Sequence, residues 1–406
     1  MATATAEEVY ELPAAAVRTL TQPGLRLELH CISISHYCMR AKWALQLAGL
    51  PFAAVHYLPL AHVAGIKRLQ RRFNQGPGAA TASSKSPSAT PVLAIYSPQG
   101  EPLSLVANST LISRYAALRA AAAPTALLVT RAIPAAALHY LLPCCSLVAN
   151  STLISRYAAL RAAAVDLPGI GQQLYGPNLT LALPAAGAAV DQAAGSSSSS
   201  KVVGAGPQYE AVSQLELRLS GTLGIEVRRV MYHYLLPRWH LAGHLFSANA
   251  SSTIGWLLSP LTYLLSRLLL PKVMAINAAT AARGMQRLQE EFDFFDSVLL
   301  TQQQQQQQGK KAAVAAAADG SSSGKLPYYL CGPQLTAADV SVAGLGGYVV
   351  GVPAGQMGLA WSPGIEDMPK ELGHFMQSLR ERPTGQFILE MWRVHGPLLQ
   401  QGTKRA

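Results

Sequence analysis

The apolar and polar positions of residues 25–48 follow two different periods. Residues 25–35 alternate and are rich in residues that favour strands, so they predict a β-strand. Residues 39–48 place apolar side chains three and four positions apart, and Gly49 follows them, which predicts a helix that ends at this glycine. The segment is therefore predicted to form a strand, a short turn and a helix.

A second β pattern precedes another helix. Residues 91–96 form a short apolar run, residues 97–100 have the composition of a tight turn, and residues 103–107 predict a returning strand. Asn108, Ser109 and Thr110 then have the polar character of a helix start, and the helix is expected to run to residue 122.

From residue 209 onward the apolar positions follow the helical period. They do so in residues 209–236, 278–300, 336–349 and 370–394, each of which predicts a helix. A small α/β domain is therefore expected to precede an all-helical domain.

Low-complexity tracts and one repeat interrupt these patterns. Residues 185–207 predict a flexible connector, and Gln302–Gln308 with residues 309–324 predict a second, looped-out insertion. Residues 104–122 recur without a change as residues 146–164, which indicates a recent duplication or a gene-model error rather than a structural repeat. We expect the first copy to complete the sheet; the alternative is a swap that uses Asn150 and Ser151 of the second copy.

Composition restricts the classes of protein and of site. The five cysteines among 406 residues are scattered, so they predict neither a disulfide framework nor a zinc site, and we expect no metal. Because no disulfide framework is predicted, we expect a reducing compartment and predict a cytoplasmic protein. The first residues resemble an organellar leader weakly, so that alternative stays open.

The formal charge of +11 raises the question of nucleic-acid binding. The dense basic cluster is formed by Lys67, Arg68, Arg71 and Arg72, and no aromatic residue lies among them as a stacking surface. We therefore expect no nucleic-acid partner.

The most apolar region covers residues 254–276. Pro260, Arg267, Pro271 and Lys272 interrupt it, and a membrane-spanning helix needs about 20 mostly apolar residues. We expect no integral membrane span and interpret the region as buried helices, with contact to a membrane surface as the alternative.

The turn formed by Ser35, His36, Tyr37 and Cys38 is the first candidate for chemistry. It lies between the predicted strand and helix, where the free N–H groups of a helix N-terminus favour an anion such as a thiolate. A Cys-x-x-Cys pair occupies this place in thioredoxin-like folds, and here Ser35 replaces its first cysteine. The structural alternatives are an ordinary N-cap for Ser35 and a small buried residue for Cys38.

Two further segments have the order that such a site requires. Thr90, Pro91 and Val92 have the form of a cis-proline strand that faces the turn and pairs with a peptide ligand. Asn108 and Ser109 open a helix whose N–H groups and hydroxyl suit a carboxylate. An ordinary strand start and an ordinary cap remain the alternatives.

These motifs together resemble the glutathione S-transferase family. The N-terminal resemblance rests on the turn at residues 35–38 and on the residues 40–45 and 50–52 that follow it. The helical half agrees at residues 223–236, 329–333 and 382–387, and Thr336 with Asp339 forms an N-capping box.

The resemblance implies a thioredoxin-like α/β N-terminal domain and an all-α C-terminal domain. The implied division is a flexible segment at 1–24, a glutathione-binding domain at 25–164, a linker at 165–207, a helical domain at 208–398 and a tail at 399–406. The helical domain contains the insertion at about residues 302–325.

The resemblance also implies a glutathione site. Ser35 would donate a hydrogen bond to the glutathione sulfur, and Val92, after a cis-Pro91, would pair with the cysteinyl backbone. Ser109 would hold the γ-glutamyl carboxylate, with Asn108 beside it. His36 and Asn108 depart from the family, where many members have proline and an acidic residue; without that acid glutathione should bind more weakly.

The implied reaction is conjugation of glutathione to a small hydrophobic electrophile. The second substrate would lie near Tyr232 and Arg228, and the resemblance implies a homodimer. Two alternatives stay open: a glutathione-dependent thiol–disulfide or peroxidase enzyme that uses Cys38 or Cys31, and a non-catalytic binding or scaffold protein of the same fold.

Overall fold

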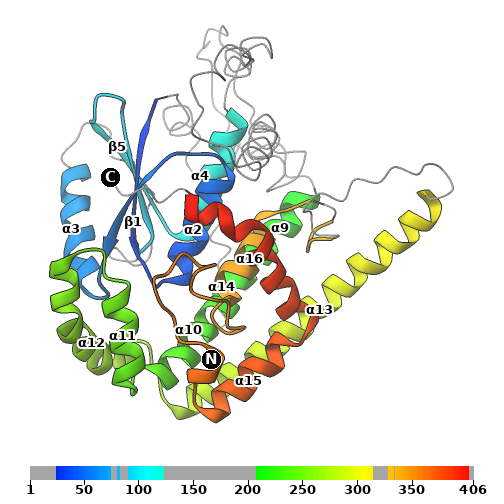
Figure 1. The fold of residues 1–406 in the computed structure, drawn as a ribbon. Helices are drawn as coiled ribbons and strands as arrows, with labels where there is room; N and C mark the ends of the chain where they lie inside the picture. The colour runs from blue at the N-terminus through cyan, green and yellow to red at the C-terminus, as the bar shows by residue number, and fades with distance from the viewer. Residues whose placement is uncertain are drawn as a thin grey trace, which may run out of the picture.

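The computed structural model shows a mixed sheet in its N-terminal part and mostly helices after it (Figure 1), as the hydrophobic pattern predicts. The structure describes residues 24–74, 80–82, 90–122, 207–313, 328–332 and 334–401. The duplicated copy at 146–164 and the connector at 165–206 lie outside these ranges, so the domain boundaries there stay predictions.

The sheet has five strands. They are β1 (Arg26–Ile32), β2 (Ala53–Tyr57), β3 (Ala80–Ala82), β4 (Val92–Tyr96) and β5 (Pro102–Ala107), in the order β2-β1-β4-β5-β3. β1 is parallel to β2 and antiparallel to β4, β4 is antiparallel to β5, and β3 is parallel to β5. The predicted hairpin is confirmed: Ser97 N–H donates to the Glu101 carbonyl at 2.9 Å, and Gly100 has a φ of 92°.

Helices cover both faces of the sheet because its central strands alternate between two apolar clusters. Leu93 and Ile95 of β4 pack in one cluster with α2 (His36–Leu47) and α4 (Ser109–Ala122). Val92, Ala94 and Tyr96 pack in another cluster with α3 (Ala61–Asn74). Figure 1 shows α3 and α2 on opposite sides of β1. The first repeat copy thus supplies β5 and α4.

The C-terminal part is helical. Its elements are α9 (Pro207–Arg218), the π-helix η2 (Leu219–Leu223), α10 (Gly224–Leu235), α11 (Trp239–Ala248), α12 (Thr253–Val273), α13 (Ala278–Ala313), α14 (Ala337–Gly346), the 3-10 helix η3 (Ile365–Asp367), α15 (Lys370–Arg380) and α16 (Pro383–Gln401). Every residue of α14 is buried, so this helix forms the centre of the helical core. The predicted capping box at Thr336 and Asp339 is confirmed, and the Thr336 N–H donates to Asp339 Oδ2 at 2.7 Å.

The structure corrects three of the helix predictions. The π-helix η2 interrupts the first long helix, and α15 ends before Pro383, which begins α16 at a position where a helix tolerates proline. Gln302–Gln308 is not looped out: it continues α13, because glutamine and alanine favour a helix that is already formed.

The buried interpretation of residues 254–276 is wrong. Most large apolar side chains of α12 are exposed, and the buried residues of this helix are Ser259, Thr262, Tyr263 and Ser266. In the described part of the chain, α12 is also long and apolar enough by composition to cross a membrane. Sequence hydropathy does not reveal which face of a helix packs against its neighbours.

The helix α2 lies between the sheet and the helical part. Its Arg40 is fully buried, forms an ion pair with Glu216 of α9 and donates to Ser220 Oγ at 2.6 Å. Trp43 of α2 packs against Trp392 of α16, with ring centroids 4.5 Å apart. These contacts fix the N-terminal end of α2, and with it the turn at residues 35–38, against the helices.

Candidate functional site

Ser35 is the N-cap residue of α2. Its backbone is extended, its N–H donates to the Ile32 carbonyl at 3.0 Å, and its own carbonyl accepts from the Met39 N–H at 2.9 Å. Its half-buried side chain makes no capping hydrogen bond to the helix. The Ser35 side chain lies near the sulfur of Cys38 and opposes the rise that burial causes in the pKa of this thiol.

The Cys38 thiol is enclosed. Its Sγ accepts a hydrogen bond from the Ile32 N–H at 3.4 Å. Burial raises the pKa of Cys38, and hydrogen bonds from Ser35, Ile32 and Thr90, with the charge of Lys42, offset this only in part. The Cys38 sulfur is therefore held as a protonated thiol at neutral pH.

Cys31 is equally inaccessible. It is buried in β1, its Sγ lies 3.6 Å from His56 Nδ1, and burial raises its pKa to about 12. Since a thiolate is the reactive form of cysteine, neither Cys31 nor Cys38 has the environment of an attacking sulfur.

The start of β4 faces this turn. The peptide bond between Thr90 and Pro91 is cis, as predicted, and the side chain of Thr90 reaches Cys38. The Pro91 carbonyl accepts a hydrogen bond from the Asn108 N–H at 3.1 Å. The beginning of β4 is thereby connected to Cys38 on one side and to the beginning of α4 on the other.

Val92 does not have the place that the sequence analysis assigns to it. β4 lies inside the sheet, and Val92 is in register with His30 of β1 and Ala107 of β5. Its buried side chain packs in the cluster that contains α3, on the face away from α2. Thr90 lies before the strand and is half-buried. The sequence signal was the cis-proline motif, which does not fix which neighbour of the proline leaves the sheet.

Asn108 and Ser109 open α4 as expected. Asn108 has a φ of 81°, a left-handed conformation that asparagine tolerates, and its Oδ1 accepts from the Thr110 N–H at 2.9 Å. Ser109 is only 1% exposed, and its Oγ has no hydrogen-bond partner among the described residues. An unpaired buried hydroxyl is unfavourable, so Ser109 is the unusual polar residue at the start of α4.

His36 is buried and points to the helical part. Its Nε2 lies 3.0 Å from the Gly224 carbonyl, so this nitrogen carries the proton and donates to that oxygen. Burial, followed by the charge of Arg228, lowers the pKa of His36 to about 3. A neutral His36 does not supply positive charge to the turn. Its role there is the hydrogen bond that links the turn to α10.

Arg228 and two tyrosines approach the turn from the helices. The Arg228 guanidinium lies 5.8 Å from the ring centroid of Tyr37, whose hydroxyl donates to the Ser220 carbonyl at 3.0 Å. Burial raises the pKa of the half-buried Tyr232, and Arg228 opposes that rise, so Tyr232 and Arg228 lie within range of each other. The Tyr348 hydroxyl donates to the Ile34 carbonyl at 2.9 Å. Sequence periodicity gave no signal for Tyr348.

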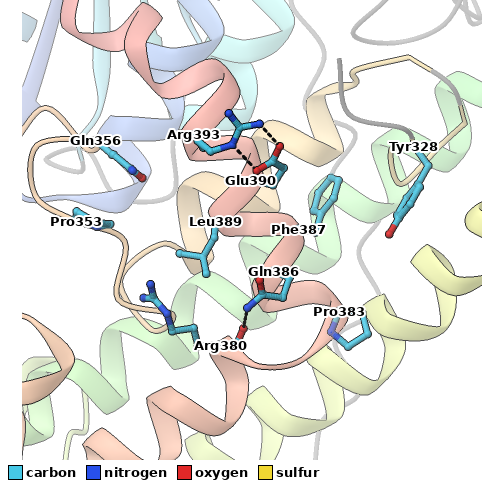
Figure 2. Close-up of a pocket in the computed structure, with 10 residues that line it drawn as sticks. All are labelled: Tyr328, Pro353, Gln356, Arg380, Pro383, Gln386, Phe387, Leu389, Glu390 and Arg393. Carbon is cyan, nitrogen blue, oxygen red and sulfur yellow. Dashed lines mark hydrogen bonds and ion pairs between the residues drawn. The ribbon is translucent and has the colours of Figure 1, made fainter. Parts of the chain in front are cut away.

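Two cavities lie away from this corner. Figure 2 shows one of about 510 Å³ at α15 and α16, where Glu390 pairs with Arg393 and Gln386 donates to the Arg380 carbonyl. Because these polar groups bond to each other, they do not converge on an unfilled position. Another, of about 570 Å³, is lined by residues that include Gln214 and Cys331. Neither cavity contains a residue of the predicted glutathione site.

Metal ligands and known relatives give no further assignment. Within the described ranges, no three or more His, Cys, Asp or Glu side chains form a group that could hold a metal ion. No protein-family model, curated protein or solved structure matches this chain.

Proposed function

We propose that this protein is a glutathione transferase. The observation that carries the proposal is the meeting of Ser35 and Thr90 at the sulfur of Cys38, beside the cis-Pro91. This meeting brings the N-terminus of α2 against the start of β4, and the Asn108–Pro91 hydrogen bond adds the start of α4. The arrangement supports the thioredoxin-like site that the resemblance implies.

The chemistry would be activation of a thiol that belongs to the ligand. A free thiol has a pKa of about 8.5, and lowering it by ~2 units requires about 2.7 kcal/mol. The Ser35 hydroxyl and the N-terminus of α2 are the groups that would favour a thiolate here. The thiol proton passes to solvent, the sulfur lone pair bonds to the electrophilic carbon, and the leaving group departs with its bonding electrons.

The start of α4 would bind the γ-glutamyl end. A carboxylate there would give the unpaired Ser109 hydroxyl an acceptor, and the N-terminus of α4 would favour its negative charge. Asn108 already accepts from the Thr110 N–H, so its oxygen is occupied. Since it also carries no charge, the γ-glutamyl ammonium has a weaker partner than an acidic residue would provide.

The described contacts disfavour the thiol–disulfide alternative. Both Cys31 and Cys38 are buried, with raised pKa values, whereas a nucleophilic cysteine needs an accessible thiolate. The non-catalytic alternative stays a second hypothesis. Glutathione binding separates it from the enzyme. The homodimer and the cytoplasmic location stay predictions.

The test is conjugation of glutathione to an aryl halide by Ser35→Ala and by a matched serine variant. A hydrogen bond to a charged group contributes about 1.5–3 kcal/mol, so Ser35→Ala should lower kcat/KM roughly 10- to 100-fold near neutral pH. Ser33→Ala is the control, because the Ser33 hydroxyl lies 2.8 Å from His56 Nδ1 and is engaged there.

Cys38→Ser should leave the conjugation rate nearly unchanged. Equal rates for wild type and Ser35→Ala would place the activity elsewhere. A loss in Cys38→Ser that exceeds the loss in Ser35→Ala would favour disulfide exchange instead.

A further inference from the structure

The helix α12 presents its apolar side chains to the outside. Its buried positions are Ser259, Thr262, Tyr263 and Ser266, three of them small and polar. Ten large apolar side chains of the same helix are between 40% and 80% exposed: Ile254, Trp256, Leu257, Leu258, Leu261, Leu264, Leu265, Leu268, Leu269 and Val273. A surface helix of a water-soluble protein normally has the opposite orientation.

Specific contacts hold α12 in this orientation. The Tyr263 hydroxyl donates to the Leu236 carbonyl at 2.9 Å, and the Tyr263 ring packs against Phe246 of α11 with centroids 6.4 Å apart. The Ser252 side chain caps the helix by accepting from the Gly255 N–H at 3.0 Å. Figure 1 shows α11 and α12 together at one edge of the molecule, at the lower left. Rotation of α12 to bury its leucines would break these contacts.

Exposed cations lie on α12 and at the start of α13. Arg267 and Lys272 of α12 and Arg283 of α13 are exposed. Arg229 and Arg287, by contrast, are neutralised by ion pairs with Glu226 of α10. The surface is therefore apolar at its centre and cationic around it.

The exposed leucines and the cations around them distinguish between the possible binding partners of α12. A second copy that used the same face in a two-fold interface would bring its cations against those of the first. An anionic lipid surface matches both the leucines and the charges, and each lysine or arginine near it contributes about 1 kcal/mol. Ten exposed apolar side chains on one helix indicate a surface that binds a partner.

We propose that the exposed face of α12 binds the surface of membranes that contain anionic lipids. The helix lies in the plane of the interface, with its leucines among the acyl chains and Trp256 at the level of the headgroups. It does not span the bilayer, because a span would remove α12 from α11 and place Arg267 in the hydrocarbon. This proposal is independent of the proposed glutathione chemistry.

The test is flotation of the full-length protein with lipid vesicles. Vesicles of phosphatidylcholine with phosphatidylserine should carry the wild-type protein upward, and high salt should reduce this. The triple variant Leu261→Gln/Leu264→Gln/Leu268→Gln should lower the partition coefficient roughly 100-fold or more. Leu217→Gln/Leu300→Gln is the control, because both leucines are exposed on other helices.

A charge variant tests the second half of the proposal. Arg267→Gln/Lys272→Gln should lower binding to anionic vesicles by roughly 10-fold or more and leave binding to pure phosphatidylcholine vesicles unchanged. Circular dichroism checks that each variant is folded.

Three results would overturn the proposal. They are failure of the wild type to float, equal flotation of the wild type and the leucine variant, and equal binding to both kinds of vesicle. Sedimentation without lipid adds a fourth: a dimer that the leucine variant converts to monomers would assign this face to a second copy of the chain.

Discussion

The helices α2 and α12 use their residue types in opposite ways. In α2 the charged Arg40 is completely buried, because Glu216 and Ser220 of the helical part meet its guanidinium. In α12 the leucines are exposed, because Tyr263 and the small polar residues occupy the contact with α11. The comparison teaches that the available partner, more than the hydropathy of a side chain, decides what is buried in this molecule.

Arg40→Ala should have the largest effect on stability. It leaves the Glu216 carboxylate buried without its ion-pair partner, and breaking a buried pair in this way costs about 3–5 kcal/mol. Urea denaturation measures the loss. Arg393→Ala is the control: Arg393 pairs with Glu390 at the surface, so the urea midpoint should not change. Equal midpoints for both variants would mean that the Arg40 contact does not stabilise the fold.

Gly224→Ala should have the next largest effect. A Cβ at Gly224 would lie 2.5 Å from the Tyr37 hydroxyl oxygen, so Tyr37 has to leave its hydrogen bond to Ser220. We expect a loss of about 1–3 kcal/mol by thermal unfolding. Gly221→Ala, in the adjacent π-helix, is the matched control because nothing lies within 4 Å of its Cβ position. A loss that is as large in Gly221→Ala would contradict the close packing of the turn.

His36→Gln should change the pH dependence of stability. In the unfolded chain His36 binds a proton near pH 6.5, but in the folded protein its pKa is about 3. Between these values the unfolded state binds more protons, so the wild type loses up to about 1.4 kcal/mol per pH unit as the pH falls.

Glutamine keeps a donor for the Gly224 carbonyl but does not titrate, so the variant should have a flatter stability curve between pH 6 and 4. The other histidines whose pKa burial lowers, His30, His56, His62 and His395, contribute to the remaining slope. Asp339, whose pKa is raised to about 6, opposes it. Parallel urea titrations of both proteins at several pH values measure how stability depends on pH. Identical curves would mean that His36 already titrates normally.

The leucine variants of α12 should have the smallest effect on stability. Leu261→Gln replaces a side chain that is 55% exposed. The free energy of unfolding, measured without lipid, should therefore change by less than about 0.5 kcal/mol. A loss of several kcal/mol would show that this face is covered in the free protein, and the contrast with α2 would disappear.

Local patterns predicted much of the fold. The strand and helix around the turn follow from their periods, and Gly49, with a φ of 64°, ends α2 as expected. The cis-Pro91 and the capping box at Thr336 were predicted from short motifs whose geometry is local. Such features depend on residues that are close in the sequence.

The features that escaped prediction depend on distant residues. Arg40 and Glu216 are separated by 176 positions, so their pairing has no local signal. The error at Val92 arose because the sequence does not show that β4 has neighbours on both sides. The error at α12 arose because its length and hydropathy are those of a buried helix, whereas its packing face is polar.

Calorimetric titration with glutathione tests the central claim, the glutathione site, most directly. Comparison of Ser109→Ala with its matched control Ser113→Ala tests whether binding uses the start of α4. The Ser113 hydroxyl already donates to the Ser109 carbonyl, whereas the Ser109 hydroxyl has no partner among the described residues. We expect saturable binding by the wild type, a roughly 10-fold or greater loss of affinity in Ser109→Ala, and little change in Ser113→Ala. Absence of saturable heat at millimolar glutathione in the folded wild type would contradict the proposed function.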